Sequence, residues 1–97
     1  MHIIEADGIW ITAIVENRWV QAKVYQIPSN YGVNEGMVSK ICIGKSAARD
    51  PNSNFFNQMD YNYDRGLDFD DLNNDGMLNS IIEQLENYRK KHPYMVD

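Results

Sequence analysis

The chain has 97 residues, of which 43% are hydrophobic and 24% are charged. This composition is that of one ordinary globular domain, and the length excludes an enzyme built from separate cofactor and substrate domains. The net charge is −5 and the densest basic run is short, at residues 89–91, so we expect no direct binding of nucleic acid. We therefore expect a single domain over residues 1–97.

The cysteine content and the hydropathy favour a cytoplasmic protein. Cys42 is the only cysteine, so it has no internal disulfide partner, as is typical of a reducing compartment. Residues 1–10 are too short and too acidic for a signal peptide. No apolar stretch approaches the roughly 20 residues of a membrane-spanning helix.

The first half of the chain predicts three strands. Residues 2–6 form a strand that ends at Asp7-Gly8, a favoured hairpin turn. Residues 9–15 are β-branched and aromatic on both faces, which indicates a strand inside a sheet. Residues 18–27 alternate between apolar and polar positions, so we expect one buried face, formed by Val20, Ala22 and Val24.

Two loops and two further strands follow. Residues 28–36 and 45–53 are rich in Gly, Pro, Asn and Ser and are predicted as loops around a strand at 37–43. Residues 55–64 again alternate. Met59, Tyr61 and Tyr63 fall on one face of that strand, and Asp60, Asn62 and Asp64 fall on its polar outer face.

The chain then enters an acidic linker that runs to Gly76, and a helix over residues 75–91 ends it. Asn74 or Asp75 is the expected N-cap, and Gln84 is placed on the face opposite the core. The apolar positions have helical spacing and comprise Leu78, Ile81, Ile82, Leu85 and Tyr88. The predicted fold class is α+β, an antiparallel β-meander of four to five strands with one C-terminal α-helix packed on one face.

The acidic charge is unevenly distributed, because the whole net charge of −5 lies in residues 51–97. A row of exposed carboxylates resembles the charge row of a nucleic acid, so it would occupy a basic groove on another protein. The expected partner-binding carboxylates are Asp60, Asp64, Asp68, Asp70, Asp71 and Asp75. Tyr61 and Tyr63, with Tyr31 and Trp19, are the expected aromatic anchors.

Several short stretches resemble a family of small uncharacterised bacterial and phage proteins, a domain of unknown function. They are residues 10–15, 22–25, 28–33, 39–41 and 63–68, and the resemblance spans most of residues 10–90. It implies a β-meander with a C-terminal helix and a phage or mobile-element context, and it transfers no catalytic residue. We expect a small non-enzymatic protein of the bacterial host cytoplasm that inhibits a nucleic-acid enzyme, like DNA mimics and anti-CRISPR proteins. A homodimer is left open.

The leading alternative is a calcium-stabilised domain. Residues 71–76 match D-x-N-x-D-G, the first half of an EF-hand loop, and the ligands would be Asp71, Asn73, Asp75 and the carbonyl of Met77. The second half fails, because Ile82 stands where the loop needs a bidentate glutamate. An Asp- and Asn-rich helix N-terminus explains the same residues without a metal.

A minor hydrolase is the second alternative. Asp68 with Asp70 or Asp71 would form its carboxylate pair, although clustered surface aspartates are more often a solvated face. A Cys–His nucleophilic pair requires His2 or His92 to fold beside Cys42. The sequence predicts no cofactor and no resident metal.

Overall fold

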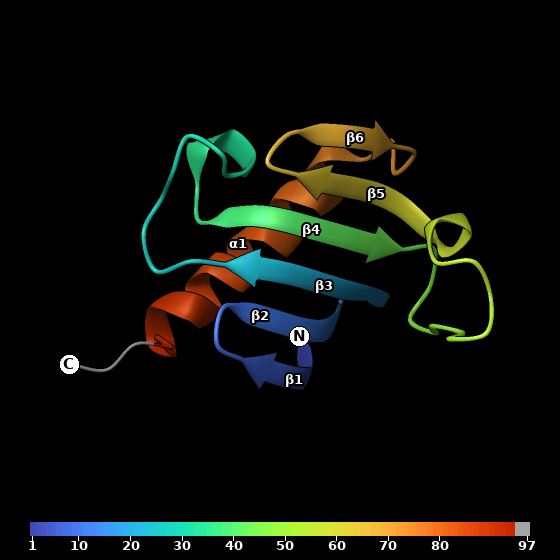
Figure 1. The fold of residues 1–97 in the computed structure, drawn as a ribbon, viewed down its shortest axis with the longest axis horizontal. Coiled ribbons are helices and arrows are strands. Elements are labelled where there is room, and N and C mark those ends of the chain that lie inside the picture. The colour runs from blue at the N-terminus through green and yellow to red at the C-terminus, as the bar shows by residue number, and fades with distance from the viewer. Residues whose placement is uncertain (95–97) are drawn as a thin grey trace.

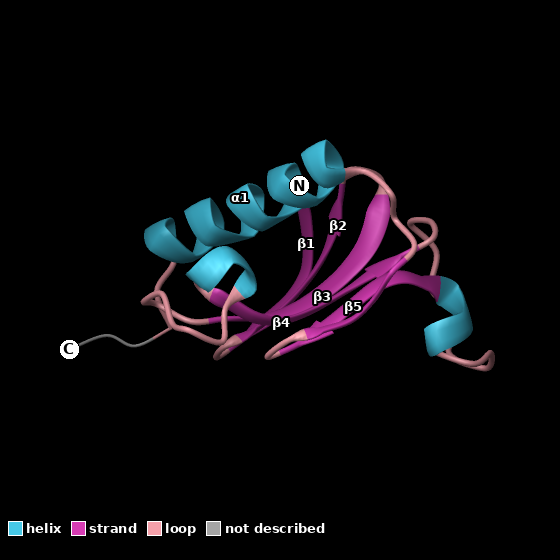
Figure 2. Ribbon diagram, turned by 90° about the horizontal axis from the view of Figure 1, so that it is seen from above, coloured by secondary structure: helices cyan, strands magenta, loops and turns pink. Residues whose placement is uncertain are grey.

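The computed structural model describes residues 1–94, which form two layers (Figure 1). One layer is a six-stranded antiparallel sheet whose strands neighbour one another in chain order, and the other is a single helix. The elements are β1 (His2–Asp7), β2 (Trp10–Val15), β3 (Arg18–Val24), β4 (Val38–Gly44), β5 (Met59–Asp64), β6 (Leu67–Asp70) and α1 (Asp75–Lys91). Figure 2 shows α1 lying across one face of the sheet and leaving the other face open.

The α+β meander with a C-terminal helix is confirmed, but the sheet has six strands and not four to five. The additional strand, β6, lies inside the segment predicted as an acidic linker. Its sequence, LDFD, carries two aspartates, which are depleted in strands, so it has no strong local strand signal. It forms because Arg65, at φ 58°, and Gly66 make a tight turn that folds it back onto β5.

Two predicted strand ends are also corrected. β3 ends at Val24 instead of reaching residue 27, although the Tyr25 amide still donates to the Met37 carbonyl at 2.9 Å. Residues 56–58 form a short 3-10 helix, so β5 begins at Met59 and not at residue 55.

The core lies between the sheet and α1, where the predicted alternation holds. Val20, Ala22 and Val24 are fully buried on the helix side of β3. Ile11, Ala13 and Val15 are equally buried on β2, which lies between β1 and β3, inside the sheet as expected. The α1 residues Ile81, Ile82 and Leu85 complete this core.

Helix α1 begins and ends where the sequence predicts. The Asn74 side chain accepts a hydrogen bond from the Met77 amide, which settles the choice between Asn74 and Asp75 as the N-cap. The placement of Gln84 is corrected, because its amide donates to Glu16 at 3.0 Å and to Ser80 at 3.1 Å. Gln84 is therefore half-buried against the β2–β3 turn and does not face open solvent.

Candidate acidic pocket between β6 and α1

A hollow of about 440 Å³ opens between edge strand β6 and the first turns of α1, on the helix side of the sheet. Four residues predicted as the partner-binding site line it together: Tyr61, Tyr63, Asp70 and Asp75. The remaining wall, which sequence reasoning missed, comes from Val33, Asn34, Leu67, Leu78 and Asn79. We call this hollow, with these nine lining residues, the acidic pocket.

Local hydrogen bonds of the chain position its carboxylates. The Asp71 amide donates to the Asp60 carbonyl at 2.6 Å, which extends the β5–β6 ladder by one bond. The Asp70 carboxylate then accepts from the Leu72 amide at 3.0 Å, and this Asx-type bond turns the chain toward α1. Leu72 is buried and anchors the turn, so the carboxylates of Asp70 and Asp75 lie near the start of the helix.

The pocket combines negative charge with aromatic walls. Neither Asp70 nor Asp75 forms an ion pair with any of residues 1–94. Burial, followed by the negative charge of Asp70, raises the pKa of Tyr61 to about 12. The Tyr61 phenol is protonated at neutral pH, as an ordinary tyrosine is, and is a neutral group near Asp70.

The two tyrosines are less exposed than an anchor role requires. The Tyr61 side chain is only 3% exposed and belongs to the core. The Tyr63 hydroxyl donates to the Tyr31 carbonyl at 2.9 Å, which fixes its orientation. Both tyrosines therefore form walls of the pocket and do not project from the surface.

Asp64, by contrast, lies on the open face, and cations compensate both Asp60 and Asp64. Asp60 accepts from Arg18 at 2.8 Å and from Lys45 at 3.2 Å. Burial by itself would raise the Asp60 pKa, but these two hydrogen-bonded cations outweigh it, and the pKa is lowered. Asp64 lies 3.6 Å from Lys40 and 3.7 Å from Arg65.

The other two predicted carboxylates are exposed outside the pocket. Asp68 accepts from the Asn62 amide at 2.6 Å, on the side of β5 opposite Tyr61. Asp71 is exposed in the turn before α1. The six aspartates therefore divide between two faces of the sheet and do not form one continuous row.

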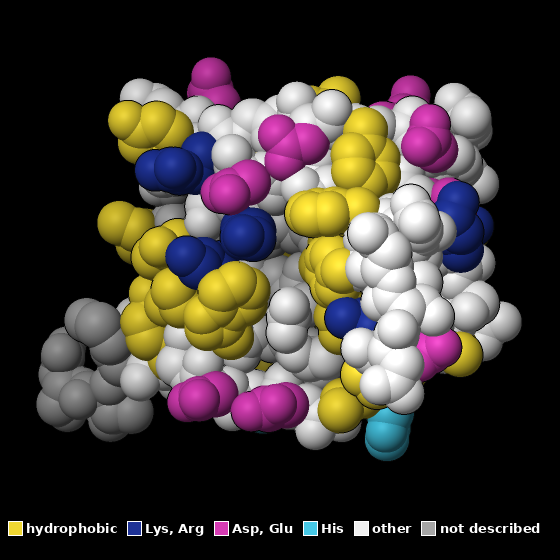
Figure 3. All heavy atoms as spheres, turned by 45° about the vertical axis from the view of Figure 1, so that its right-hand side comes forward, with side chains coloured by type: hydrophobic (Ala, Val, Ile, Leu, Met, Phe, Trp, Pro, Cys, Tyr) yellow, Lys and Arg dark blue, Asp and Glu magenta, His cyan; other side chains and the backbone are white. Residues whose placement is uncertain are grey.

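The open face mixes charges of both signs with hydrophobic groups, as Figure 3 shows. Trp19 packs edge-on against Phe55, with the Arg49 guanidinium 4.8 Å from the Phe55 ring centroid. Lys23 lies 5.1 Å from the ring centroid of Trp10. Two cations of this face, Arg49 and Lys23, thus lie against aromatic rings.

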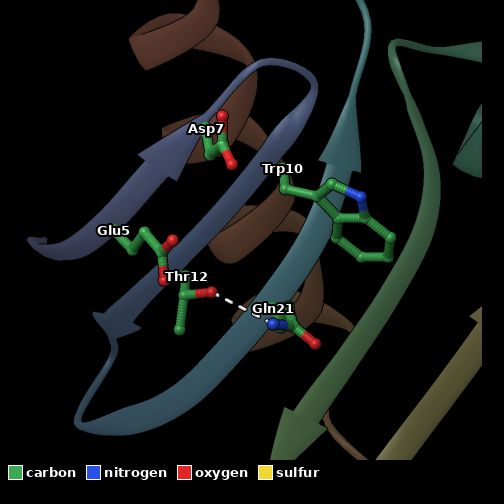
Figure 4. Close-up of a pocket in the computed structure, with 5 residues that line it drawn as sticks. All are labelled: Glu5, Asp7, Trp10, Thr12 and Gln21. Atoms are coloured by element: carbon green, nitrogen blue, oxygen red, sulfur yellow. Dashed lines mark hydrogen bonds between the residues drawn. The ribbon is translucent and has the colours of Figure 1, made fainter.

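A shallow hollow lies at the β1 end of the open face (Figure 4). Its lining residues are Glu5, Asp7, Trp10, Thr12 and Gln21, and Gln21 donates to the Thr12 hydroxyl at 3.2 Å. Sequence reasoning did not identify this hollow, because its lining residues come from three strands that become neighbours only when the sheet forms.

The structure gives the calcium alternative little support. Residues 75–82 are helical, so the Met77 carbonyl points along the helix axis instead of into a calcium loop. Among the described residues, no three His, Cys, Asp or Glu side chains come together in a way that could hold a metal ion.

The carboxylates proposed for a hydrolase bond to different groups of the chain. Asp68 bonds to Asn62, whereas Asp70 bonds to the Leu72 amide, and only Asp70 lines the pocket. Cys42 is buried on β4, three strands from His2, and its thiol donates to the Gln21 carbonyl at 3.6 Å. Burial raises the pKa of this thiol to about 11, which is the opposite of an activated nucleophile.

Taken together, the fold and the pocket define a small two-layer α+β domain that carries an acidic hollow at one edge of its sheet. Within residues 1–94, no helix is long and apolar enough to cross a membrane. The chain belongs to a family described as a domain of unknown function, DUF7678, whose model matches residues 9–88. This agrees with the expected membership of an uncharacterised family. No curated protein and no solved structure matches the chain.

Proposed function

We propose that the protein is a non-enzymatic binding protein whose acidic pocket receives a basic side chain from the surface of a partner protein. The observation that carries this proposal is the pocket itself. It places the carboxylates of Asp70 and Asp75, which have no ion-pair partner among residues 1–94, beside aromatic and aliphatic walls.

The chemistry of the pocket suits lysine or arginine. Each of these side chains has an apolar stem and a cationic head, which prefer different surroundings. Tyr63, Leu67 and Leu78 offer contact surface for the stem. Asp70 and Asp75 offer charge-assisted hydrogen bonds to the head.

The partner class follows from the charge. Clustered lysine and arginine are characteristic of nucleic-acid-binding surfaces, and a net charge of −5 steers a small domain toward such a surface. Occupation of that surface would exclude nucleic acid, so the expected outcome is inhibition of a nucleic-acid enzyme. A phage or mobile-element origin, with action in the cytoplasm of a bacterial host, is part of this proposal.

The test is a pull-down from bacterial lysate with two variants of equal charge. The pocket variant is Asp70→Asn with Asp75→Asn, in which the amide oxygen introduced at position 70 can still accept from the Leu72 amide. The control is Glu5→Gln with Glu83→Gln, which removes two exposed carboxylates elsewhere. We expect wild type and control to capture the same protein, the pocket variant to lose it, and added duplex DNA to displace it.

Ionic strength provides the second arm of the test. Capture should weaken as salt rises above ~0.15 M, where charges more than about 8 Å apart are screened. The acidic pocket would be excluded as the binding site if the pocket variant and the control captured the partner equally. It would also be excluded if neither salt nor duplex DNA reduced the capture.

A further inference from the structure

A second groove, of different chemistry, lies at the end of the open face where β3 ends, β4 begins and β5 turns into β6. Two adjoining hollows of about 290 and 320 Å³ share Tyr25, Ser39 and Arg65. One half is mainly apolar and is completed by Ile27, Pro28, Ser29 and Tyr31. The other half is charged and is completed by Lys23, Lys40 and Asp64. We call the two halves together the amphiphilic groove.

The apolar half exposes large side chains. Ile27 is 73% exposed and Tyr31 is 63% exposed, and Tyr25 is exposed beside them. Contiguous apolar groups of this kind, rimmed by polar residues, are typical of interaction sites. Tyrosine and arginine, which both line the groove, are also enriched among the residues that dominate binding energy.

The loop that carries these side chains is held in place before any partner binds. The Ser29 amide donates a hydrogen bond to the Gly36 carbonyl at 3.1 Å, and the Met37 amide donates one to the Glu86 carboxylate of α1 at 2.8 Å. Gly32 packs so closely that a Cβ atom at this position would overlap the Gly36 carbonyl oxygen. A loop tied in this way loses little conformational entropy on binding.

The cations of the charged half are only loosely paired. Lys40 and Arg65 share the single carboxylate Asp64, at 3.6 and 3.7 Å, and the Arg65 side chain is 72% exposed. Exposed ion pairs of this length contribute little to stability. A carboxylate of a partner can therefore replace Asp64 beside either cation with little loss of free energy. Arg18, by contrast, is bonded to Asp60 at 2.8 Å and is only 21% exposed, so it is not available to a partner's carboxylate.

We propose that the amphiphilic groove binds a short acidic segment of a partner protein that carries one aromatic or aliphatic anchor residue. The anchor packs on Tyr25, Ile27 and Tyr31, and the flanking carboxylates pair with Lys40 and Arg65. Charge complementarity favours an acidic segment, because Lys23, Lys40 and Arg65 outnumber the single carboxylate Asp64 in the charged half. The mainly apolar other half favours a peptide with an apolar anchor over a phosphate backbone. This site is separate from the acidic pocket, which takes a basic group.

The experiment titrates the 15N-labelled full chain with the peptide Ac-EDFDE-amide and follows backbone amide shifts. We expect saturable shifts at residues 25–31, 39–40 and 65, and weaker binding by Ac-EDADE-amide, which lacks the anchor. Lys40→Gln with Arg65→Gln should weaken binding about three- to tenfold. Ile27→Ser should weaken it by about tenfold. The charge-matched control, Lys90→Gln with Lys91→Gln, alters two residues near the end of α1 and should bind like wild type.

Three results would overturn the proposal. The first is the absence of saturable shifts at millimolar peptide, or shifts elsewhere on the chain. The second is equal or tighter binding of a dT10 oligonucleotide, which would assign the groove to a phosphate backbone. The third is a concentration-dependent dimer without peptide whose interface shifts map to the groove, which would assign it to a second copy of the chain.

Discussion

At the scale of single residues, Arg89 shows how tertiary contacts change the role of a side chain. The sequence places it with Lys90 and Lys91 as a basic group that complements the helix dipole. In the structure Arg89 is 3% exposed and donates to the carbonyls of Val24, Gly8 and His92. It thus ties the end of α1 to the β1–β2 turn and to β3, and burial lowers its pKa.

Asp60 supports a prediction about pH at the same scale. Its pKa is lowered in the folded state from an ordinary value of 3.8, so its stabilising effect is fully present above that value. The effect is lost as pH falls through the lower, folded-state pKa. Asp60→Asn should therefore reduce the free energy of unfolding by about 1–2 kcal/mol at pH 7 and by progressively less below pH ~4.

Urea unfolding of wild type and variant at pH 7, 5 and 3 measures this difference. Asp71→Asn is the control, because the Asp71 carboxylate is exposed and forms no ion pair with the described residues. A difference between wild type and Asp60→Asn that stays constant across the three pH values would mean that the ion pairs with Arg18 and Lys45 do not stabilise the fold.

At the scale of elements, α1 is the only helix that covers the sheet among the described residues, so the core depends on its apolar face. Leu85 is fully buried. Leu85→Ala should lower the free energy of unfolding by about 2–5 kcal/mol, because the side chain is lost and a cavity remains. Denaturant unfolding, followed by circular dichroism, measures the change.

The control for this variant is Asn87→Ala, an exposed position on the same helix that should be nearly neutral. Gln84 does not serve as a control, because it bonds to Glu16 and Ser80. Equal losses at Leu85 and Asn87 would contradict the assignment of the buried face of α1.

At the scale of the whole molecule, the acidity of residues 51–97 does not become one acidic surface. Successive residues of a strand point to opposite faces, so Asp64 separates from Asp70, which pairs with Tyr61. Basic residues from the first half of the chain then pair with two of these carboxylates, Arg18 and Lys45 with Asp60 and Lys40 with Asp64. At the β6–α1 end, Asp70 and Asp75 have no ion-pair partner among the described residues.

The thermal stability of the whole chain provides a test of calcium binding. Because residues 75–82 are helical, Asp71, Asn73 and Asp75 lack the loop that would wrap an ion. A site this incomplete is expected to bind calcium at millimolar strength at best. Addition of ~1 mM calcium should then raise Tm by at most about 3 °C, which corresponds to ~0.4 kcal/mol when the concentration equals Kd.

The control is sodium chloride of equal ionic strength, measured by the same thermal melt. A calcium-specific rise of about 10 °C that disappears in Asp71→Ala would contradict this expectation. It would also favour a calcium-stabilised domain over the binding protein proposed above.

The sequence by itself determined the features that arise within a few residues of one another. The alternation in β3 predicted which of its side chains face the core, and the apolar spacing predicted α1 over residues 75–91. The tertiary structure alone decided the existence of β6, the burial of Arg89, the separation of the aspartates and both binding hollows. These features depend on contacts between residues far apart in the chain, such as Arg18 with Asp60 and Arg89 with Gly8. No local pattern encodes such contacts, because only the packed sheet and helix bring these residues together.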